Sequence, residues 1–342
     1  MIKLTTTVII GGFFGDEGKG KIISYLALKD SVAATVRGGV GPNAGHTVIY
    51  QGKKFKLRMI PCGILNESAK LMIGPGVLVN PDVLIEEAKK YKLEGRILVD
   101  SQCAVIEDKH ISQDKQGYLK SRIGTTGTGT GPANSDRVLR SGRLLSEIES
   151  VSQFLADIPL EVNRLVDEGK PVLIEGTQGT FLSLYFGTHP FVTSKDVCAS
   201  AICSDVGLGP KKIDEVLVVF KAYVTRVGSG PIKGELTDEM ASKHGWREVG
   251  TVTGRSRRAA PFDMDLAKRA VMLNSASQLA ITKLDVVFPE VAGVTEFGKL
   301  SNEAKKFVEK IEVSLGVPVT LIGTGGEAFH TVDRRKELLA KN

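Results

Sequence analysis

Short apolar segments alternate with helical patterns along the whole chain. Seven such segments, rich in Val and Ile, cover residues 7–10, 32–36, 97–99, 172–174, 216–220, 278–281 and 319–322. Parallel strands need a crossover connection, usually a helix, so this alternation predicts an α/β fold with a large, mostly parallel central sheet flanked by helices. Because no low-complexity linker interrupts the pattern, we expect residues 1–342 to form a single domain.

Two helices of this scaffold have clear boundaries in the sequence. Asn80 and Pro81 suit an N-cap and a first turn, and they begin a helix that runs to about Tyr91. Ser301 begins another helix, whose apolar residues share one face until Gly316 ends it. The glycine-rich segments mostly follow the strand segments, and ligands of such sheets bind beyond the carboxyl ends of the strands. We therefore expect several loops to meet at one cleft.

The first strand segment runs directly into a glycine-rich loop, residues 11–21, with the sequence GGFFGDEGKGK. A strand that ends in glycines before a helix presents backbone N–H groups to an anion at the positive end of the helix dipole. Lys19 adds a point charge for a phosphate. A bare phosphate would repel Asp16, so this acid makes sense only with Mg²⁺ between them or with a proton to remove. The loop thus predicts chemistry in addition to phosphate binding.

This loop differs from the P-loop pattern G-x-x-x-x-G-K-S/T. Aligning that pattern on Gly18 and Lys19 requires glycine at Phe13 and a hydroxyl residue at Gly20, and both requirements fail. Without the hydroxyl, Mg²⁺ must be held in another way, which argues against an ordinary P-loop GTPase or kinase. The alternative interpretation is a structural turn with a solvated lysine, but such a turn has no need of so many glycines, acids and lysines together.

Two further glycine-rich segments carry candidate ligand-binding groups. His46 ends the run GGVGPNAGH, where the backbone can approach a ligand closely, and we expect this histidine to lie in a loop as a candidate acid. Residues 123–132, IGTTGTGTGP, alternate hydroxyls with glycines and suit a phosphate monoester. Arg137 and Arg140 follow, and an arginine fork can bind phosphate through two hydrogen bonds. A flexible surface loop is the alternative for this segment.

Three segments in the second half of the chain indicate a purine and another anion. Lys283 and Asp285 end a strand segment in the pattern K-x-D, and an ionised aspartate accepts two hydrogen bonds from guanine that adenine cannot supply. Gln178 follows a buried strand segment, and its amide can pair with a purine carbonyl and ring nitrogen. Residues 251–258, TVTGRSRR, offer hydroxyls and guanidiniums to a dicarboxylate. Structural or surface-charge interpretations remain open for each segment alone.

Charge and cysteine content limit the partners. The formal net charge of +6 and pI near 9.0 favour anions. Tryptophan occurs once and the only dense basic cluster is 255–258, so small anions are favoured over nucleic acid. The apolar stretch after Lys3 is too short to span a bilayer and lacks a cleavage site, so we expect no membrane contact and a cytoplasmic location. The cysteines, at positions 62, 103, 198 and 203, lack C-x-x-C spacing and are expected to be buried thiols.

Seven motifs, taken in order, resemble those of the adenylosuccinate synthetase family. They are G-D-E-G-K-G-K, N-A-G-H-T, I-G-T-T-G-x-G-x-G-P, E-G-x-Q-G-T, K-A-Y-x-T-R-V-G-x-G-P, T-G-R-x-R-R and T-K-L-D, and they cover nearly the whole chain. The resemblance implies a GTP-dependent ligase that condenses IMP with L-aspartate to adenylosuccinate, through a 6-phosphoryl-IMP intermediate, in AMP synthesis. It also implies a fold that resembles P-loop GTPases by convergence, one Mg²⁺ per active site, GTP as co-substrate, and a homodimer.

The resemblance further implies roles for individual residues. Asp16 would take the proton from ring nitrogen 1 of IMP, His46 would stabilise or protonate the phosphoryl transfer, and Gln178 would complete the catalytic set. Mg²⁺ would be held by Asp16 and the Gly45 carbonyl. The implied GTP-binding residues are Gly15, Glu17, Gly18, Lys19, Gly20, Thr47, Lys283, Asp285, Thr324 and Gly325. The implied IMP-binding residues are Asp16, Asn43, Thr126, Arg140, Gln178, Thr193 and Arg257, with Arg140 reaching the partner's site in the dimer. The implied aspartate-binding residues are Thr253, Gly254, Arg255 and Arg257.

Four positions depart from the common pattern of this family. Thr128 stands where many members have arginine, Arg137 where lysine is usual, Val252 where a threonine contacts aspartate, and Gly326 where proline is usual. The chain is also shorter than common bacterial and eukaryotic members and resembles the compact archaeal form. Two other classes stay open from the sequence alone. A regulatory GTP-binding protein or GTPase would hydrolyse GTP without IMP and aspartate, and a basic nucleic-acid binder would lose affinity steeply with salt.

Overall fold

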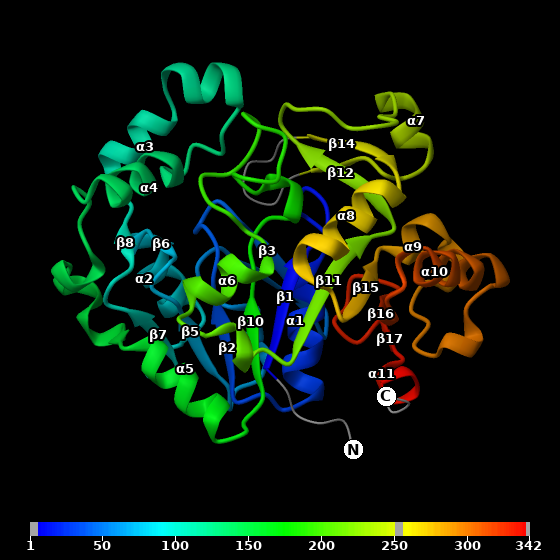
Figure 1. The fold of residues 1–342 in the computed structure, drawn as a ribbon, viewed down its shortest axis with the longest axis horizontal. Coiled ribbons are helices and arrows are strands. Elements are labelled where there is room, and N and C mark those ends of the chain that lie inside the picture. Colours follow the sequence, from blue (N-terminus) through cyan, green and yellow to red (C-terminus); the bar gives the residue numbers. More distant parts are fainter. Residues whose placement is uncertain (1–5, 250–255, 340–342) are drawn as a thin grey trace.

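A ten-stranded sheet runs through the middle of the molecule (Figure 1). The structure is a computed structural model, and it describes residues 6–249 and 256–339. The strand order is β17-β16-β15-β11-β1-β10-β2-β5-β7-β9, and each neighbouring pair is parallel except β16 and β17. These strands are β1 (Thr6–Gly11), β2 (Ala34–Arg37), β5 (Lys70–Ile73), β7 (Ile97–Asp100), β9 (Leu155–Ala156), β10 (Val172–Glu175), β11 (Glu215–Lys221), β15 (Gln278–Thr282), β16 (Val319–Gly323) and β17 (Thr331–Asp333). The predicted α/β class is confirmed.

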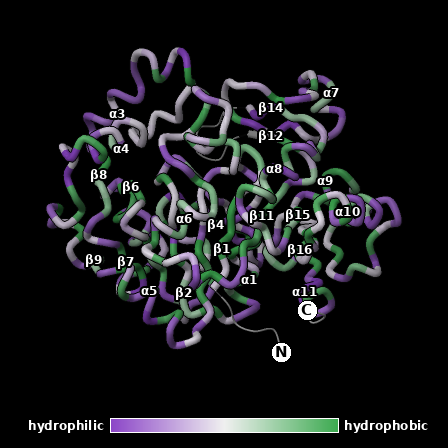
Figure 2. The backbone as a smooth tube through the Cα atoms, in the orientation of Figure 1, coloured by the Kyte–Doolittle hydropathy of each residue, from purple (hydrophilic) through white to green (hydrophobic). Residues whose placement is uncertain are grey.

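Both faces of the sheet are buried, because alternate residues of one strand belong to two separate hydrophobic clusters. Val8 and Ile10 of β1 pack in one cluster, and Ile9 between them packs in the other. The helices that cover the first face are α5 (Ile158–Asp167), α6 (Ala199–Asp205), α8 (Met264–Asn274) and α10 (Asn302–Leu315). The second face is covered by α1 (Lys19–Lys29) and α2 (Pro81–Lys90). Figure 2 shows the hydrophobic residues concentrated along the central strands.

The remaining elements are shorter and lie mainly around the sheet. An antiparallel sheet contains β12 (Tyr223–Val227), β14 (Ser256–Pro261) and β13 (Glu248–Val249), and a hairpin contains β3 (His46–Tyr50) and β4 (Lys53–Leu57). A parallel pair contains β6 (Leu78–Val79) and β8 (Ala104–Val105). The other helices are α3 (Asp108–Asp114), α4 (Thr130–Leu139), α7 (Asp238–Lys243), α9 (Leu284–Val287) and α11 (Arg335–Leu338). In Figure 1, α3 and α4 rise on one side above the sheet, and β12 and β14 rise on the other.

The seven predicted strand segments all lie in the central sheet, with ends shifted by at most a few residues. Both predicted helix boundaries are confirmed, since the Asn80 side chain accepts a hydrogen bond from Val83 N and the Ser301 side chain accepts one from Ala304 N. The four cysteines are buried and free, as predicted. Within residues 6–249 and 256–339, no helix combines the length and the apolar character that a membrane span requires.

Candidate active site

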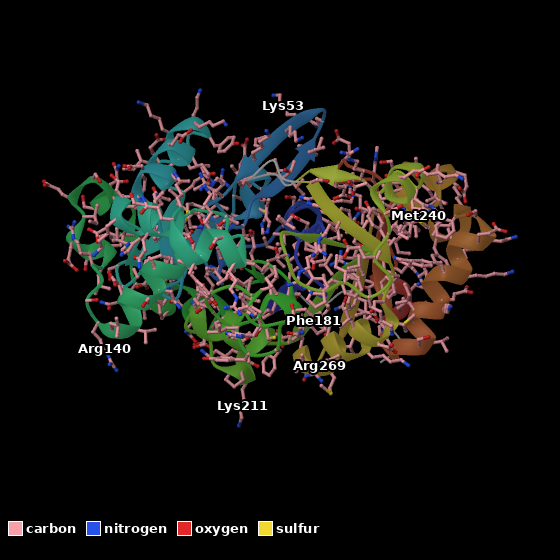
Figure 3. The ribbon with its side chains drawn as sticks, turned by 90° about the horizontal axis from the view of Figure 1, so that it is seen from above. Lys53, Arg140, Phe181, Lys211, Met240 and Arg269 are labelled. Carbon is pink, nitrogen blue, oxygen red and sulfur yellow. The ribbon has the colours of Figure 1, made fainter. Side chains whose placement is uncertain are left out.

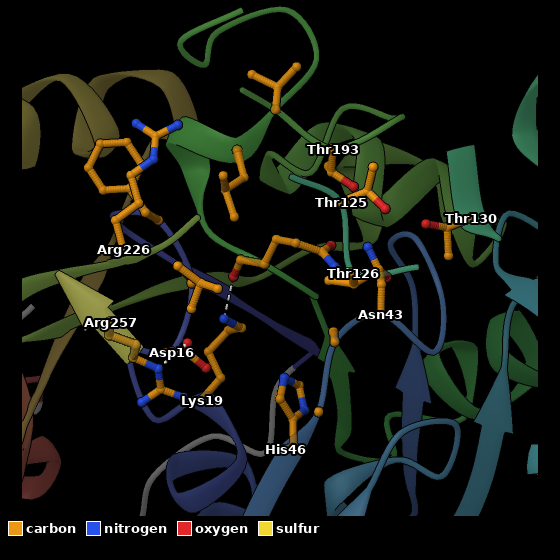
Figure 4. A pocket seen from close by; sticks show the side chains of 18 of the residues that line it. Asp16, Lys19, Asn43, His46, Thr125, Thr126, Thr130, Thr193, Arg226 and Arg257 are labelled. Atoms are coloured by element: carbon orange, nitrogen blue, oxygen red, sulfur yellow. Dashed lines mark hydrogen bonds and ion pairs between the residues drawn. The ribbon is translucent and has the colours of Figure 1, made fainter. Parts of the chain in front are cut away.

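A pocket of about 690 Å³ lies where the carboxyl ends of the central strands point. Its walls come from the segments that follow β1, β2, β10, β15 and β16, and from segments near α3, α4, β12 and β14. The loops that were predicted to meet at one cleft therefore do so (Figure 4). Fifteen of the implied site residues line it: Gly15, Asp16, Gly18, Lys19, Gly20, Asn43, Gly45, His46, Thr47, Thr126, Gln178, Thr193, Arg257, Lys283 and Gly325.

The loop after β1 is shaped by an acid that faces inward. Glu17 is buried, and its Oε1 accepts hydrogen bonds from Phe13 N at 3.0 Å and Gly15 N at 2.8 Å. Its Oε2 lies 3.1 Å from Lys19 Nζ. A Cβ at position 179 would come within 2.4 Å of Glu17 Oε1, so glycine is required there. The Glu17 side chain therefore fixes the conformation of the loop through these hydrogen bonds. Unlike the other implied GTP-binding residues of the loop, it does not line the pocket.

Asp16 is engaged by an arginine of the small antiparallel sheet. Its Oδ2 forms an ion pair with Arg257 Nε at 2.8 Å, and the Asp16 side chain is 28% exposed. Arg257 also pairs with Glu248, which accepts a hydrogen bond from Lys221 Nζ at 2.9 Å. Burial favours the neutral form of Glu248, but Lys221, Lys283 and Arg257 outweigh it and lower the pKa of this carboxyl to about 2. The network fixes the arginine beside the acid of the phosphate loop.

His46 departs from the sequence-based expectation of a loop position. It is buried and begins β3, because the apolar residues after it pair with β4 in an antiparallel hairpin. Its Nδ1 lies 2.6 Å from Glu175 Oε1, and the same carboxylate accepts hydrogen bonds from Arg37 Nη1 at 3.0 Å and Cys62 N at 2.6 Å. Nε2 has no hydrogen-bond partner within the described residues, so it is left for a ligand.

The ionisation states of this buried group follow from opposing effects. Burial lowers the pKa of His46, and the attraction of Glu175 opposes that shift only in part. For Glu175, burial favours the neutral form, but the charges and hydrogen bonds of His46 and Arg37 hold its pKa below the usual range. Sequence reasoning assigned no role to Glu175, although it stands at the start of the motif that contains Gln178. A buried carboxylate that fixes one histidine nitrogen orients the other toward the pocket.

Two amide side chains of the implied IMP site contact each other. Gln178 Nε2 donates a hydrogen bond to Asn43 Oδ1 at 3.1 Å, although one side chain follows β10 and the other follows β2. Gln178 has a φ of 53°, and Asp16 and Lys283 have φ of 61° and 59°. A non-glycine residue in this left-handed region is strained by about 1–3 kcal/mol, and such strain concentrates at functional sites. Three lining residues from three loops share this property.

The threonine-rich segment of residues 123–132 is ordered by a buried acid of α3. Asp114 accepts hydrogen bonds from Thr125 Oγ1 at 2.6 Å and from Gly129 N at 2.9 Å. Thr126 lines the pocket, and α4 begins within the segment at Thr130. The segment thus presents hydroxyls and the first turn of a helix to the cavity, which suits an anion. No signal in the sequence distinguished Asp114 from other acids of this region.

The implied guanine-binding residues stand where β15 and β16 end. Asp285 is not among the residues that line the pocket, and its Oδ1 is buried with no hydrogen-bond partner among the described residues, so this acceptor is unsatisfied without a ligand. Lys283 and Gly325 line the pocket. Thr324 is buried and its Oγ1 donates to Val294 O at 2.6 Å, so its side chain supports the loop from within.

The other implied residues are Arg140 and three residues of the expected aspartate loop. Arg140 is exposed at the end of α4, lies at the edge of the molecule in Figure 3, and is not among the residues that line the pocket. Thr253, Gly254 and Arg255 lie outside the described residues, so the expected aspartate loop is represented here only by Arg257.

The family model described as Adenylosuccinate synthetase matches residues 8–150 and 143–291. Curated relatives of that name are similar over almost their full length. The protein from Methanocaldococcus jannaschii is 54% identical over 342 residues, which cover 99% of each chain. The protein from Archaeoglobus fulgidus is 54% identical over 334 residues, 97% of this chain and 99% of the relative. The protein from Methanosphaera stadtmanae is 50% identical over 340 residues, 98% of this chain and 100% of the relative.

Solved structures show the same fold. A fully ligated adenylosuccinate synthetase from Plasmodium falciparum matches with a TM-score of 0.89 and 27% identity, over 96% of this chain and 99% of that one. A succinoaminodeoxyadenylate synthetase from cyanophage S-2L matches with a TM-score of 0.81 and 24% identity, over 98% of this chain and 97% of that one. At that identity the phage protein supports the fold alone.

Proposed function

Because the chain belongs to the adenylosuccinate synthetase family, we propose that the pocket described above is where it joins IMP to L-aspartate. The protein is a GTP-dependent ligase of AMP synthesis. One observation carries the assignment of the site. Asp16, an acid inside a phosphate-binding loop, shares a single cavity with Lys19, with the Gln178 amide and with the loops that end β15 and β16.

The reaction begins with Asp16 as the general base. Its carboxylate takes the proton from ring nitrogen 1 of IMP, and the electron pair moves to the 6-oxygen. That oxygen attacks the γ-phosphorus of GTP, so an O–P bond forms while the bond to the β-phosphate oxygen breaks and GDP leaves. The amino group of L-aspartate then forms a bond to C6 and phosphate leaves with the 6-oxygen. In the free protein Arg257 pairs with Asp16 at 2.8 Å, so IMP has to displace or share this contact.

His46 acts on the transferred phosphoryl group through Nε2. Its Nδ1 is 2.6 Å from Glu175, so the only proton it can offer a ligand is one on Nε2. The negative charges of Glu175 and of the phosphates favour that second proton, and burial opposes it. Gln178, whose amide already contacts Asn43 at 3.1 Å, pairs with the purine beside the reacting carbon.

The residues near Asp16 suit Mg²⁺. This ion prefers hard oxygen ligands and usually binds one or two carboxylates together with substrate phosphates. The Asp16 carboxylate is partly exposed to the pocket that Gly45 also lines, and Lys19 lies in the same wall. Asp16 and the Gly45 carbonyl would hold one Mg²⁺, which would neutralise charge on the GTP phosphates.

The nucleotides are divided between the two ends of the pocket. The IMP phosphate binds the segment of residues 123–132 and the start of α4, near Thr126 and Thr193. The guanine of GTP binds between Lys283, Asp285 and Gly325, where Asp285 Oδ1 accepts a hydrogen bond from the base. The phosphates of GTP lie along the loop after β1, at Gly15, Gly18, Lys19 and Gly20, with Thr47 nearby.

The remaining contacts involve a second subunit and the aspartate loop. Arg140 is exposed and does not line the pocket of its own chain, so we assign it to the IMP site of a partner in a homodimer. L-Aspartate contacts Arg257 and the loop of residues 253–255. We further propose that the protein works in the cytoplasm, where this pathway has its substrates, and that residues 1–342 unfold as a single domain.

An assay with each component omitted in turn tests the function. Purified protein is mixed with IMP, L-aspartate, GTP and Mg²⁺, and adenylosuccinate and phosphate are measured. The proposal expects product only with the full mixture and equal amounts of both products. Phosphate release from GTP that does not require IMP and aspartate would instead support the alternative, a regulatory GTPase.

A further inference from the structure

The second lysine of the loop motif has no role in the reaction derived above. Lys21 lies in the first turn of α1, two residues after Lys19, and it is buried although it lines the pocket. Its Nζ donates hydrogen bonds to the carbonyls of Glu327 at 2.5 Å and His330 at 2.7 Å. A Cβ at position 323 would come within 2.9 Å of Lys21 Cε, so the glycine that ends β16 gives this side chain its path.

The charge of Lys21 is held by backbone carbonyls and not by a direct ion pair. Within the described residues no carboxylate oxygen lies within 4.0 Å of its Nζ. Burial lowers the pKa of Lys21 to about 7, and the more distant charges of Asp285 and Glu327 oppose this shift. Burying an ammonium against two backbone carbonyls, without a directly paired carboxylate, costs free energy in the free protein.

The two carbonyls belong to the segment of residues 324–330, which connects β16 to β17 and contains the implied guanine-binding residue Gly325. Backbone and side-chain hydrogen bonds attach the segment to other parts of the chain. Ala328 N donates to Ile49 O at 2.9 Å, Gly52 N donates to the Glu327 side chain at 2.9 Å, and Gly293 N donates to Thr324 O at 2.8 Å. Two residues of the helix that begins at the phosphate loop contact this segment. Lys21 supplies the hydrogen bonds, and the Tyr25 ring packs against the Phe329 ring with centroids 5.6 Å apart.

The two lysines of the motif thus connect opposite ends of the nucleotide site. Lys19 Nζ donates to the carbonyl of Gln178, which follows β10, and Lys21 Nζ donates to carbonyls that follow β16. In the sheet order β16-β15-β11-β1-β10, these two strands stand four places apart. One turn of α1 therefore fixes the base-binding segment relative to the phosphate-binding loop.

We propose that Lys21 is a positioning residue for guanine, which holds residues 324–330 where the base of GTP meets Asp285 while Lys19 holds the phosphates. This inference rests on the proposed GTP site. It predicts that loss of the Lys21 hydrogen bonds weakens GTP and GDP binding without changing IMP binding or the rate of the chemical step.

The test compares Lys21→Met and Lys21→Arg with a matched control, Lys29→Met, which removes an exposed lysine from the last turn of the same helix. Initial rates give KM for GTP, KM for IMP and kcat, and calorimetry gives the Kd of GDP. For Lys21→Met we expect at least a tenfold rise in KM for GTP and in Kd for GDP, with kcat and KM for IMP within twofold of the unaltered protein. Lys21→Arg keeps two N–H donors and should recover most of the affinity.

Several results would overturn the inference. An unchanged Kd for GDP in Lys21→Met, a fall in kcat at constant KM for GTP, or an equal rise in KM for IMP would each show that Lys21 does not position the base. If Lys21→Met does not fold, Lys21→Arg and Lys21→Gln are compared instead. The arginine variant retains more N–H donors, so it should bind GDP more tightly than the glutamine variant. Equal GDP affinities of the two variants would contradict the inference. Because calorimetry with GDP needs no turnover, its outcome is separate from failure of the ligase assay.

Discussion

Replacing Asp285 by asparagine should weaken the preference of the protein for the guanine base of GTP. The same substitution should leave the stability of the ligand-free protein unchanged or raise it. The buried Oδ1 of Asp285 has no hydrogen-bond partner among residues 6–249 and 256–339. Guanine would supply two N–H donors to this carboxylate, each worth about 1.5–3 kcal/mol as a hydrogen bond to a charged group. An asparagine can accept only one of them and presents its own N–H₂ to the other.

The expected loss for GTP follows from these values. Losing one of the two hydrogen bonds, about 1.5–3 kcal/mol, lowers kcat/KM for GTP by roughly 10- to 10²-fold. Xanthosine triphosphate carries an oxygen in place of the 2-amino group, so the asparagine N–H₂ should donate to it and kcat/KM for that nucleotide should rise. The free variant no longer buries part of an unpartnered carboxylate, so its unfolding free energy should stay equal or rise by about 1 kcal/mol, equivalent to about 1–2 °C in Tm.

The assay measures initial rates with each nucleotide at saturating IMP, L-aspartate and Mg²⁺, and the Tm without ligands. Asp265→Asn is the matched control, because it removes the same charge from an exposed side chain on α8. The control should keep the nucleotide preference of the unaltered protein. An Asp285→Asn variant that also keeps its preference for GTP over xanthosine triphosphate would refute the reasoning, and so would a large loss of stability without ligand.

Three further predictions concern the reacting groups and the subunit contact. Asp16→Asn should reduce turnover by at least about 10²- to 10⁴-fold, the range for a general base, while the Kd of GTP stays within a few-fold by fluorescence titration; retention of most activity would count against the assigned base. Glu175→Gln should reduce kcat far more than Cys62→Ser. Nitrogen NMR of His46 should show that Nδ1 carries the proton in the unaltered protein and that Glu175→Gln removes this preference. Equal effects of the two substitutions would contradict a role of Glu175 in orienting His46. Mixed Asp16→Asn and Arg140→Ala chains should recover up to about a quarter of the activity, since half of the dimers then contain one intact site made from both subunits; two stable dimeric variants that recover nothing when mixed would exclude the shared site.

The sequence predicted the parts of this molecule that depend on local pattern. Strand segments buried on both faces read as continuous apolar runs, and glycine-rich loops that follow them identify the ligand cleft. The short edge strands β9 and β17 and the whole of β5, which begins with a lysine, were missed, because two to four residues carry too little periodicity to be recognised.

The missed site residues share a different cause. Glu175 contacts His46, which lies 129 positions earlier in the chain, and Asp114 contacts Gly129, which lies 15 positions later. These contacts exist only after folding. The direction of the Glu17 side chain, away from the pocket, was equally invisible in the loop motif that contains it. His46 was expected in a loop because glycines precede it, but the hairpin pairing with β4 decided its conformation. Sequence reasoning thus predicted that these loops meet at one cleft, and packing decided which of their acids line the pocket.

The path of the 6-oxygen of IMP tests the central claim most directly, since the carboxylate of Asp16 is held to deprotonate the purine so that this oxygen attacks GTP. IMP labelled with ¹⁸O at C6 is converted with unlabelled GTP and L-aspartate, and the phosphate released is analysed by mass spectrometry. The account predicts one ¹⁸O atom in each phosphate formed by the unaltered protein. Unlabelled phosphate, formed together with adenylosuccinate, would contradict it, because the phosphoryl group would then have been transferred to water.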